Sequence, residues 1–165
     1  MKTDKILFIQ TGGTIDKDYP RSSGGWAFEF GEPATHRILD KLNPSFEYKV
    51  ITAFQKDSLE IEEADRLELV KLIQSSEHAK MVITHGTDTM IETARFLAKH
   101  IKDKTIVLTG AMRPERFSNS DAPINLGMAI AAAQLSTEPK VYVCMHGIVK
   151  LANEMQRNSS TGQFF

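Results

Sequence analysis

Short apolar runs alternate along the chain with longer segments in which apolar residues recur every three or four positions. The short runs lie at residues 5–10, 48–52, 81–83, 105–109 and 141–145. Runs of this length between polar turns are typical of buried strands, and the longer spacing is typical of amphipathic helices. Because strand, turn and helix follow one another repeatedly, we predict a three-layer α/β/α domain with a mostly parallel sheet and helices on both faces.

The helical spacing predicts four helices, at residues 33–42, 60–76, 90–101 and 123–135. On the second helix the expected buried face carries Ala64, Leu67, Val70 and Ile73. On the fourth it carries Ile124, Met128, Ala131 and Leu135, with Pro123 at the first helical position. Between the first strand and the first helix, residues 16–30 predict a mobile loop or hairpin with a short strand at 26–30, and residues 150–165 predict loop or extended chain.

Two segments match the capping box, in which a polar side chain and a glutamate three residues later satisfy the first N–H groups of a helix. One begins at Asp57 and the other at Thr89. We therefore expect Asp57 and Thr89 to be cap residues, although a capped helix start can also present N–H groups to an anion. The sequence pattern assigns no structural role to Thr87 and Asp88.

Polar or glycine-bearing turns follow four of the predicted strands or the segments that extend them. They lie at residues 11–14, 57–58, 86–88 and 110–111. Parallel strands joined by right-handed connections place their carboxyl ends at one edge of the sheet, where ligands of open α/β sheets bind. The sequence therefore predicts one site at this rim.

The composition excludes several function classes. The chain has 165 residues, which predicts a single domain over residues 1–165, and its 20 basic and 21 acidic residues give a net charge of −1. No global field then favours nucleic acid or an anionic membrane surface. No apolar run approaches the roughly 18 residues that span a bilayer, and residues 1–15 lack a signal-peptide pattern, so we expect a cytoplasmic protein. Cys144 has no second cysteine to pair with and falls in a predicted buried strand.

The rim residues limit the possible chemistry. No histidine shows metal-ligand spacing, no serine lies in a Gly-x-Ser-x-Gly elbow, and no phosphate-binding glycine pattern occurs. We therefore predict no metal and no cofactor. His85 and His146 follow strand ends, where a structural role is the better interpretation. What remains is a threonine hydroxyl that attacks a carbonyl, with a neighbouring base and backbone N–H groups that hold the oxyanion.

Three segments resemble the bacterial-type L-asparaginase family. They are residues 11–15 (Thr-Gly-Gly-Thr-Ile), 84–89 (Thr-His-Gly-Thr-Asp-Thr) and 110–114 (Gly-Ala-Met-Arg-Pro). The resemblance spans nearly the whole chain and covers the family's amino-terminal, active-site domain, without its smaller carboxyl-terminal domain. It implies hydrolysis of L-asparagine to L-aspartate and ammonia through a covalent acyl-enzyme, in a homodimer or higher homo-oligomer.

The resemblance also implies roles for residues that match the family's motifs. Thr14 matches the nucleophile. Thr87 would orient the attacking water and stabilise charge, and Asp88 would bind the α-ammonium of the substrate. Tyr19, in the loop, is the counterpart of a tyrosine that assists the nucleophile, and Arg157 falls where the family has a catalytic lysine.

A second group of matching residues would bind the substrate. Ser58 matches the serine that binds the α-carboxylate, with the backbones of Asp57 and Leu59 adjacent. The Ala111 carbonyl would lie near the side-chain amide, and Gly86 completes the turn before Thr87. The zwitterion of an amino acid needs one anion and one group rich in hydrogen-bond donors, which Asp88 and the Ser58 turn would supply.

Three departures from the family pattern keep alternative functions open. Arg157 stays protonated where a lysine can lose its proton, and Lys150 is the other cation that could reach the site. Leu59 stands where the family often has a polar residue, which bears on the choice between asparagine and glutamine. A shorter chain must also close its pocket without the second domain, for example by dimerising over the rim. The alternatives are a non-catalytic amino-acid-binding or regulatory module, and an amidase for glutamine or another amide.

Overall fold

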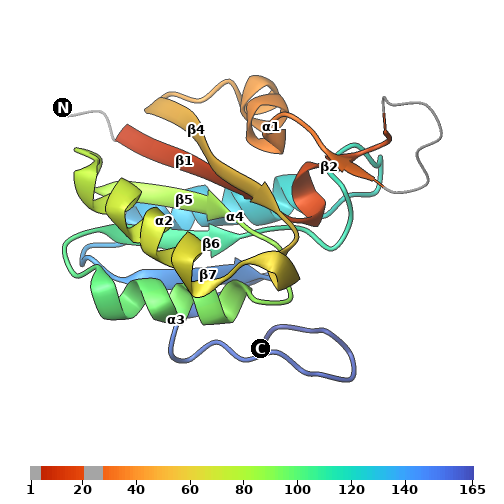
Figure 1. The fold of residues 1–165 in the computed structure, drawn as a ribbon. Helices are drawn as coiled ribbons and strands as arrows, with labels where there is room; N and C mark the ends of the chain where they lie inside the picture. Colours follow the sequence, from red (N-terminus) through yellow and green to blue (C-terminus); the bar gives the residue numbers. More distant parts are fainter. Residues whose placement is uncertain (1–4, 21–27) are drawn as a thin grey trace.

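A six-stranded sheet forms the centre of the computed structural model, which describes residues 5–20 and 28–165 (Figure 1). Its strands are β1 (Lys5–Gly12), β4 (Glu47–Lys56), β5 (Lys80–Thr84), β6 (Thr105–Thr109), β7 (Val141–Met145) and β8 (Ile148–Leu151). They lie in the order β4-β1-β5-β6-β7-β8. All neighbouring pairs are parallel except β7 and β8. The predicted fold class is confirmed.

Helices cover both faces of the sheet. They are α1 (Ala34–Leu42), α2 (Glu63–Ser75), α3 (Met90–His100) and α4 (Ala122–Leu135). In Figure 1, α2 and α3 lie in front of the sheet, while α1 and α4 lie behind it. Two short 3₁₀ turns, η1 (Thr14–Asp16) and η2 (Ser58–Glu60), follow β1 and β4. In the described ranges, every helix is too short or too polar to cross a membrane.

The central strands bury side chains on both faces. On β5, Met81 and Ile83 enter the core beneath α2 and α3, whereas Val82 enters the core beneath α1 and α4. All three are 0% exposed. Because successive side chains of a strand point to opposite faces, burial on both sides requires an unbroken apolar run. This explains why the sequence predicts β5, β6 and β7 well.

The predicted buried face of α2 is partly wrong. Val70 and Ile73 are buried as expected, but Ala64 and Leu67 are exposed. The buried positions are instead Arg66, Leu69, Val70 and Ile73. Their spacing is still that of one helical face, but the face includes an arginine, which the apolar pattern excluded.

The predicted buried face of α4 is mostly wrong: Met128 is partly buried against the core, but Ala131 is exposed. Ile124 and Leu135 are 67% and 80% exposed, and the helix buries Ala122, Asn125, Leu126, Ala129, Ile130 and Ala133. Between Asp121 and Glu138 there is no charged residue, so polarity alone does not distinguish the two sides. The small alanine side chains let the helix approach the sheet closely. The helix begins at Ala122, which places Pro123 at its second position rather than its first.

The hairpin predicted after the first strand is confirmed in its two arms. β2 (Lys17–Asp18) pairs antiparallel with β3 (Glu29–Phe30). The predicted strand at 26–30 is thus observed at its last two residues, and positions 26 and 27 lie outside the described residues.

The carboxyl-terminal segment is more ordered than predicted. After a turn in which His146 and Gly147 have φ of 52° and 79°, β8 returns antiparallel to β7. Farther on, Met155 and Phe164 are 0% and 4% exposed and belong to the core beneath α3. A segment with so few apolar residues gives no periodic signal, so only tertiary contacts reveal its packing.

The adjacent residues Phe164 and Phe165 test whether this segment contributes to stability. Phe164→Ala removes a buried ring and should lower the free energy of unfolding by about 3 kcal/mol. Phe165 is 51% exposed, so Phe165→Ala should change it by less than about 0.5 kcal/mol. Urea denaturation of both variants measures the difference. Equal effects would show that the segment does not pack as described.

Candidate active site

The predicted rim exists, because hydrogen bonds join the turns at the carboxyl ends of the strands. Gly13 N donates to Lys56 O at 3.1 Å, which links the ends of β1 and β4. Thr11 Oγ1 donates to Thr84 O at 2.7 Å, which links β1 to β5. His85 N donates to Thr109 O at 2.9 Å and links β5 to β6. The four predicted turns therefore lie along one edge of the sheet.

Three of these turns touch at two glycines. Gly13 has a φ of 86°, and a Cβ at this position would lie 2.4 Å from Gly86 N. A Cβ on Gly86 would lie 2.6 Å from the Cβ of Ser58. Such distances are far below van der Waals contact, so only glycine permits this approach. As a result, the turns that carry Thr14, Ser58 and Thr87 are in direct contact.

Ser58 lies in the capped turn η2. As predicted, Asp57 forms a capping box: its Oδ1 accepts a hydrogen bond from Leu59 N at 3.1 Å, and Asp57 N donates to Glu60 Oε2 at 3.3 Å. The hydrogen bond from Leu59 N and the ion pair with Lys17 lower the pKa of Asp57. Ser58 is 2% exposed and Leu59 is 73% exposed. The box starts a 3₁₀ turn rather than the helix itself.

The predicted capping role of Thr89 is wrong. Its side chain makes no capping hydrogen bond to α3. Instead, Thr89 Oγ1 donates to Ser58 O at 2.7 Å. This bond ties the start of α3 to η2. Thr87 and Asp88 directly precede Thr89 in the chain, so their turn is held close to η2. Local sequence spacing could not distinguish a cap from a contact 31 residues away.

Asp88 pairs with Arg157, the cation that falls where the resembling family has its catalytic lysine. Arg157 Nη1 lies 3.0 Å from Asp88 Oδ1. The same guanidinium donates from Nε to Gly162 O at 2.9 Å and lies 5.2 Å from the centre of the Phe164 ring. Lys150 is exposed on β8, so Arg157 is the cation that contacts Asp88.

Tyr19 and Ala111 are placed by hydrophobic packing. The Tyr19 side chain is 69% exposed, and its ring lies 5.1 Å from that of Phe28 and 6.5 Å from that of Phe117, centre to centre. No contact of Tyr19 with Thr14 is seen among the described residues. Ala111 is 1% exposed and belongs to the core beneath α4.

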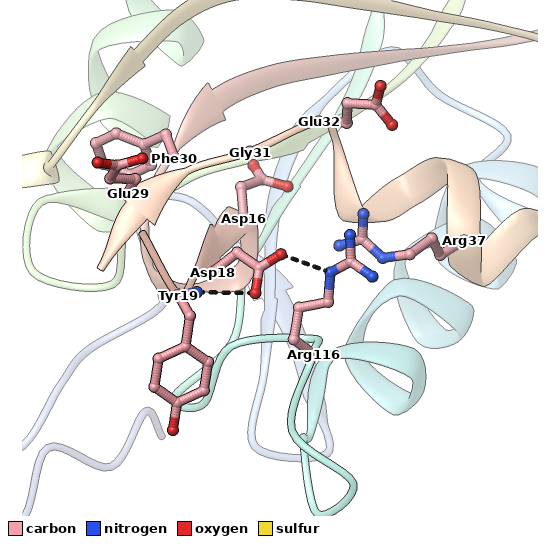
Figure 2. Close-up of a pocket in the computed structure, with 9 residues that line it drawn as sticks. All are labelled: Asp16, Asp18, Tyr19, Glu29, Phe30, Gly31, Glu32, Arg37 and Arg116. Atoms are coloured by element: carbon pink, nitrogen blue, oxygen red, sulfur yellow. Dashed lines mark hydrogen bonds and ion pairs between the residues drawn. The ribbon is translucent and has the colours of Figure 1, made fainter. Parts of the chain in front are cut away.

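A separate cavity of about 130 Å³ lies under the hairpin arms (Figure 2). Figure 2 shows Asp18 facing Arg116, to which it pairs at 3.0 Å. Asp16, which the sequence did not single out, lies at the floor and is 1% exposed. Its Oδ1 accepts a hydrogen bond from Ala34 N at 2.7 Å, while Oδ2 has no hydrogen-bond partner among the described residues. Burial raises the pKa of Asp16 to about 6.

Both histidines near the rim make hydrogen bonds within the fold. His85 is 0% exposed, and burial lowers its pKa to about 4. His146 is exposed, and its Nδ1 accepts a hydrogen bond from Phe164 N at 3.0 Å. Within the described residues, no group of three or more histidine, cysteine, aspartate or glutamate side chains could hold a metal ion.

Comparison with known proteins identifies the family. The family model "Asparaginase, N-terminal" matches residues 5–163. The chain belongs to the asparaginase family. The three contacting turns thus lie within the part of the chain that the asparaginase amino-terminal model matches.

Asparaginase relatives cover almost all of this chain. A probable periplasmic L-asparaginase of Haemophilus influenzae is 33% identical over 94% of this chain and 47% of its own length. A glutaminase-asparaginase of Acinetobacter glutaminasificans is 32% identical over 93% of this chain and 50% of its own. The thermostable L-asparaginase of Thermococcus kodakarensis superposes with a TM-score of 0.83 at 27% identity, over 98% of this chain and 50% of that one. The chain therefore spans about half the length of these relatives.

The unusual burial of Asp16 predicts a pH-dependent stability. Because the pKa is raised in the folded protein, the folded state binds the proton more tightly than the unfolded state. Stability is therefore gained as the pH falls through about 6. Between pH 7 and pH 5, wild-type protein should gain roughly 1 kcal/mol in free energy of unfolding relative to Asp16→Asn. Denaturant titrations at both pH values measure this gain, and parallel pH profiles would contradict it.

Proposed function

We propose that the protein is an amidohydrolase that converts L-asparagine to L-aspartate and ammonia through an acyl-enzyme on Thr14. The observation that carries the proposal is the direct contact between the turns that bear Thr14, Ser58 and Thr87. These turns are far apart in the chain and together carry three hydroxyl groups and the carboxylate of Asp88. Membership of the asparaginase family supports the same reaction.

The two ends of the substrate would bind to groups of opposite character. Asp88 supplies the anion for the α-ammonium group. The Ser58 hydroxyl, with the backbones of Asp57 and Leu59 beside it, would bind the α-carboxylate. The side chain of asparagine would then extend toward Thr14, with the Ala111 carbonyl near its amide. An uncharged ligand would offer no cation to Asp88, whose carboxylate pairs with Arg157 alone among the contacts described above.

The reaction would proceed in two steps. In the first, Thr14 Oγ1 attacks the side-chain amide carbon, its proton passes to the leaving nitrogen, and ammonia departs. In the second, water oriented by Thr87 attacks the acyl carbon, the ester bond to Thr14 Oγ1 breaks, and a proton from the water returns to that oxygen as aspartate leaves. Backbone N–H groups of the contacting turns would stabilise the oxyanion in both steps. Tyr19 would assist Thr14 only if the hairpin brought its ring from the Phe28 and Phe117 cluster to the rim.

Removal of either threonine hydroxyl should abolish turnover. Thr14→Ala and Thr87→Ala are each expected to lower the rate of ammonia release by roughly a thousandfold or more, with the fold intact. Thr137→Ala is the matched control, because Thr137 is exposed and follows α4, far along the chain from the rim turns. Ammonia is measured with asparagine, with glutamine and without substrate.

These assays also separate the substrates. Faster release from glutamine than from asparagine would favour a glutaminase and would point to the exposed Leu59 as the residue that alters the choice. Near-normal rates in both threonine variants would remove the proposed mechanism.

The second candidate function is a non-catalytic amino-acid-binding module. The observation that favours it is the ion pair between Asp88 and Arg157, at 3.0 Å. An arginine stays protonated at all physiological pH values and cannot accept a proton during the reaction. It also neutralises the carboxylate that would bind the α-ammonium group. Such a module would bind L-aspartate or L-asparagine and release no ammonia.

Exchange of Arg157 for lysine distinguishes the two candidates. Arg157→Lys keeps the charge beside Asp88 but allows deprotonation, so the turnover number should rise about tenfold and should show a new basic limb in its pH profile. Arg157→Met, which removes the charge, should lower turnover. A loss of turnover in both variants would mean that the site depends on the geometry of the guanidinium rather than on proton transfer.

We further propose that the protein assembles as a homodimer or higher homo-oligomer over the rim. The exposed Leu59 beside the site is the observation that supports this, because a neighbouring subunit would shield it from water. The cytoplasmic location stays a prediction, since one relative is named as periplasmic.

A further inference from the structure

A chain of buried polar groups lies beneath the Thr87 turn. The His85 ring lies between two oxygens: Nδ1 is 2.7 Å from Gly86 O, and Nε2 is 2.9 Å from Thr93 Oγ1 on α3. Thr93 Oγ1 in turn accepts a hydrogen bond from Arg66 Nε on α2 at 3.0 Å. His85 and Thr93 are 0% and 1% exposed, and Arg66 is 6% exposed. None of these groups has a part in the mechanism above.

The donors and acceptors fix the direction of every hydrogen bond. A carbonyl oxygen only accepts, so His85 Nδ1 must carry the hydrogen that bonds Gly86 O. In a neutral ring Nε2 is then an acceptor, so the Thr93 hydroxyl must donate to it. The guanidinium of Arg66 only donates, and it fills one of the two acceptor positions of the Thr93 hydroxyl. One order results, from Arg66 through Thr93 and His85 to Gly86.

The hydrogen-bonded series is fixed at Arg66 by an ion pair, and its His85 ring is uncharged. Arg66 Nη1 pairs with Glu92 Oε1 at 3.0 Å, which holds the guanidinium between α2 and α3. Burial keeps the His85 ring neutral above about pH 5, because its pKa is lowered to about 4. The hydrogen bond to Gly86 is therefore the same over the whole physiological pH range.

The last bond in the chain determines the orientation of one peptide group at the rim. A trans peptide is planar, with its carbonyl and N–H pointing in opposite directions. Because His85 holds the Gly86 carbonyl on the buried side, the N–H of Thr87 must point away from His85. Gly86 cannot slide to another position, since its backbone already touches Gly13 and Ser58.

We propose that His85, held by Thr93 and Arg66, is a positioning residue that fixes the Gly86–Thr87 peptide for the amide hydrolysis. This proposal rests on the proposed function and extends it to three residues that do not touch the substrate. A purely space-filling role would not need three polar side chains in a buried position, where each unsatisfied group is costly.

Two amides that imitate different halves of the imidazole test the proposal. In His85→Asn, the side-chain NH₂ stands near the position of Nδ1 and can still donate to Gly86 O. In His85→Gln, the amide reaches the position of Nε2 and keeps only the contact with Thr93. We expect His85→Asn to keep the turnover number within about tenfold of wild type, and His85→Gln to lose roughly a hundredfold. The Michaelis constant should change little in either variant.

A matched pair at Thr93 provides the control for stability. Thr93→Ser keeps the hydroxyl and should retain the turnover number, whereas Thr93→Val keeps the shape and should lower it. Denaturation curves are measured for all four variants. If the losses in turnover followed the losses in stability rather than the retained hydrogen bond, the histidine would be merely structural and the proposal would fall.

Nitrogen-15 NMR of the histidine rings provides a test that does not need turnover. We expect His85 to show the neutral Nδ1–H tautomer from pH 5 to pH 8. Thr93→Val should lower the population of this tautomer. A ring with hydrogen on Nε2, or one that titrates near pH 6.5, would overturn the proposal. If wild-type protein released no ammonia, the proposed function would fail. The positioning role would then be decided by this tautomer.

Discussion

The site depends on the direct contact of backbones at Gly13 and Gly86. The Gly13 turn follows β1 and the Gly86 turn follows β5, and the Ser58 side chain of η2 lies against Gly86. A single methyl group at either glycine would force the turns apart by more than a small adjustment could absorb. The helices, the sheet order and the capping of η2 together hold these turns in contact.

The sequence predicted the sheet because the central strands are buried on both faces. The observed bounds of β6 and β7 equal the predicted ones, since their apolar runs end abruptly at polar turns. The buried face of α4 could not be predicted, because its two sides are equally apolar. Arg66 was missed on α2 because a charged side chain is not expected on a buried face. Its charge is satisfied by Thr93 and Glu92, which are distant in sequence.

The candidate site was predicted in part. The rim itself follows from the parallel sheet, and the family resemblance places Thr14, Thr87 and Asp88 on it. What the sequence could not give are the contacts between distant segments. The hydroxyl of Thr89 matches a local cap but donates to Ser58 O instead. Hydrogen bonds of this kind are determined by the packed structure, after the local preferences have been overruled.

The segment after β8 has a consequence for anything joined to this domain. Phe165 exchanges two backbone hydrogen bonds with Gln156, next to the arginine that contacts Asp88. The final residue is thereby fastened within one residue of the Asp88 partner. A purification tag, a linker or a second folded unit attached after position 165 would begin its path beside the site. Its length and charge would influence access to the rim, so the choice of fusion end is itself an experimental variable.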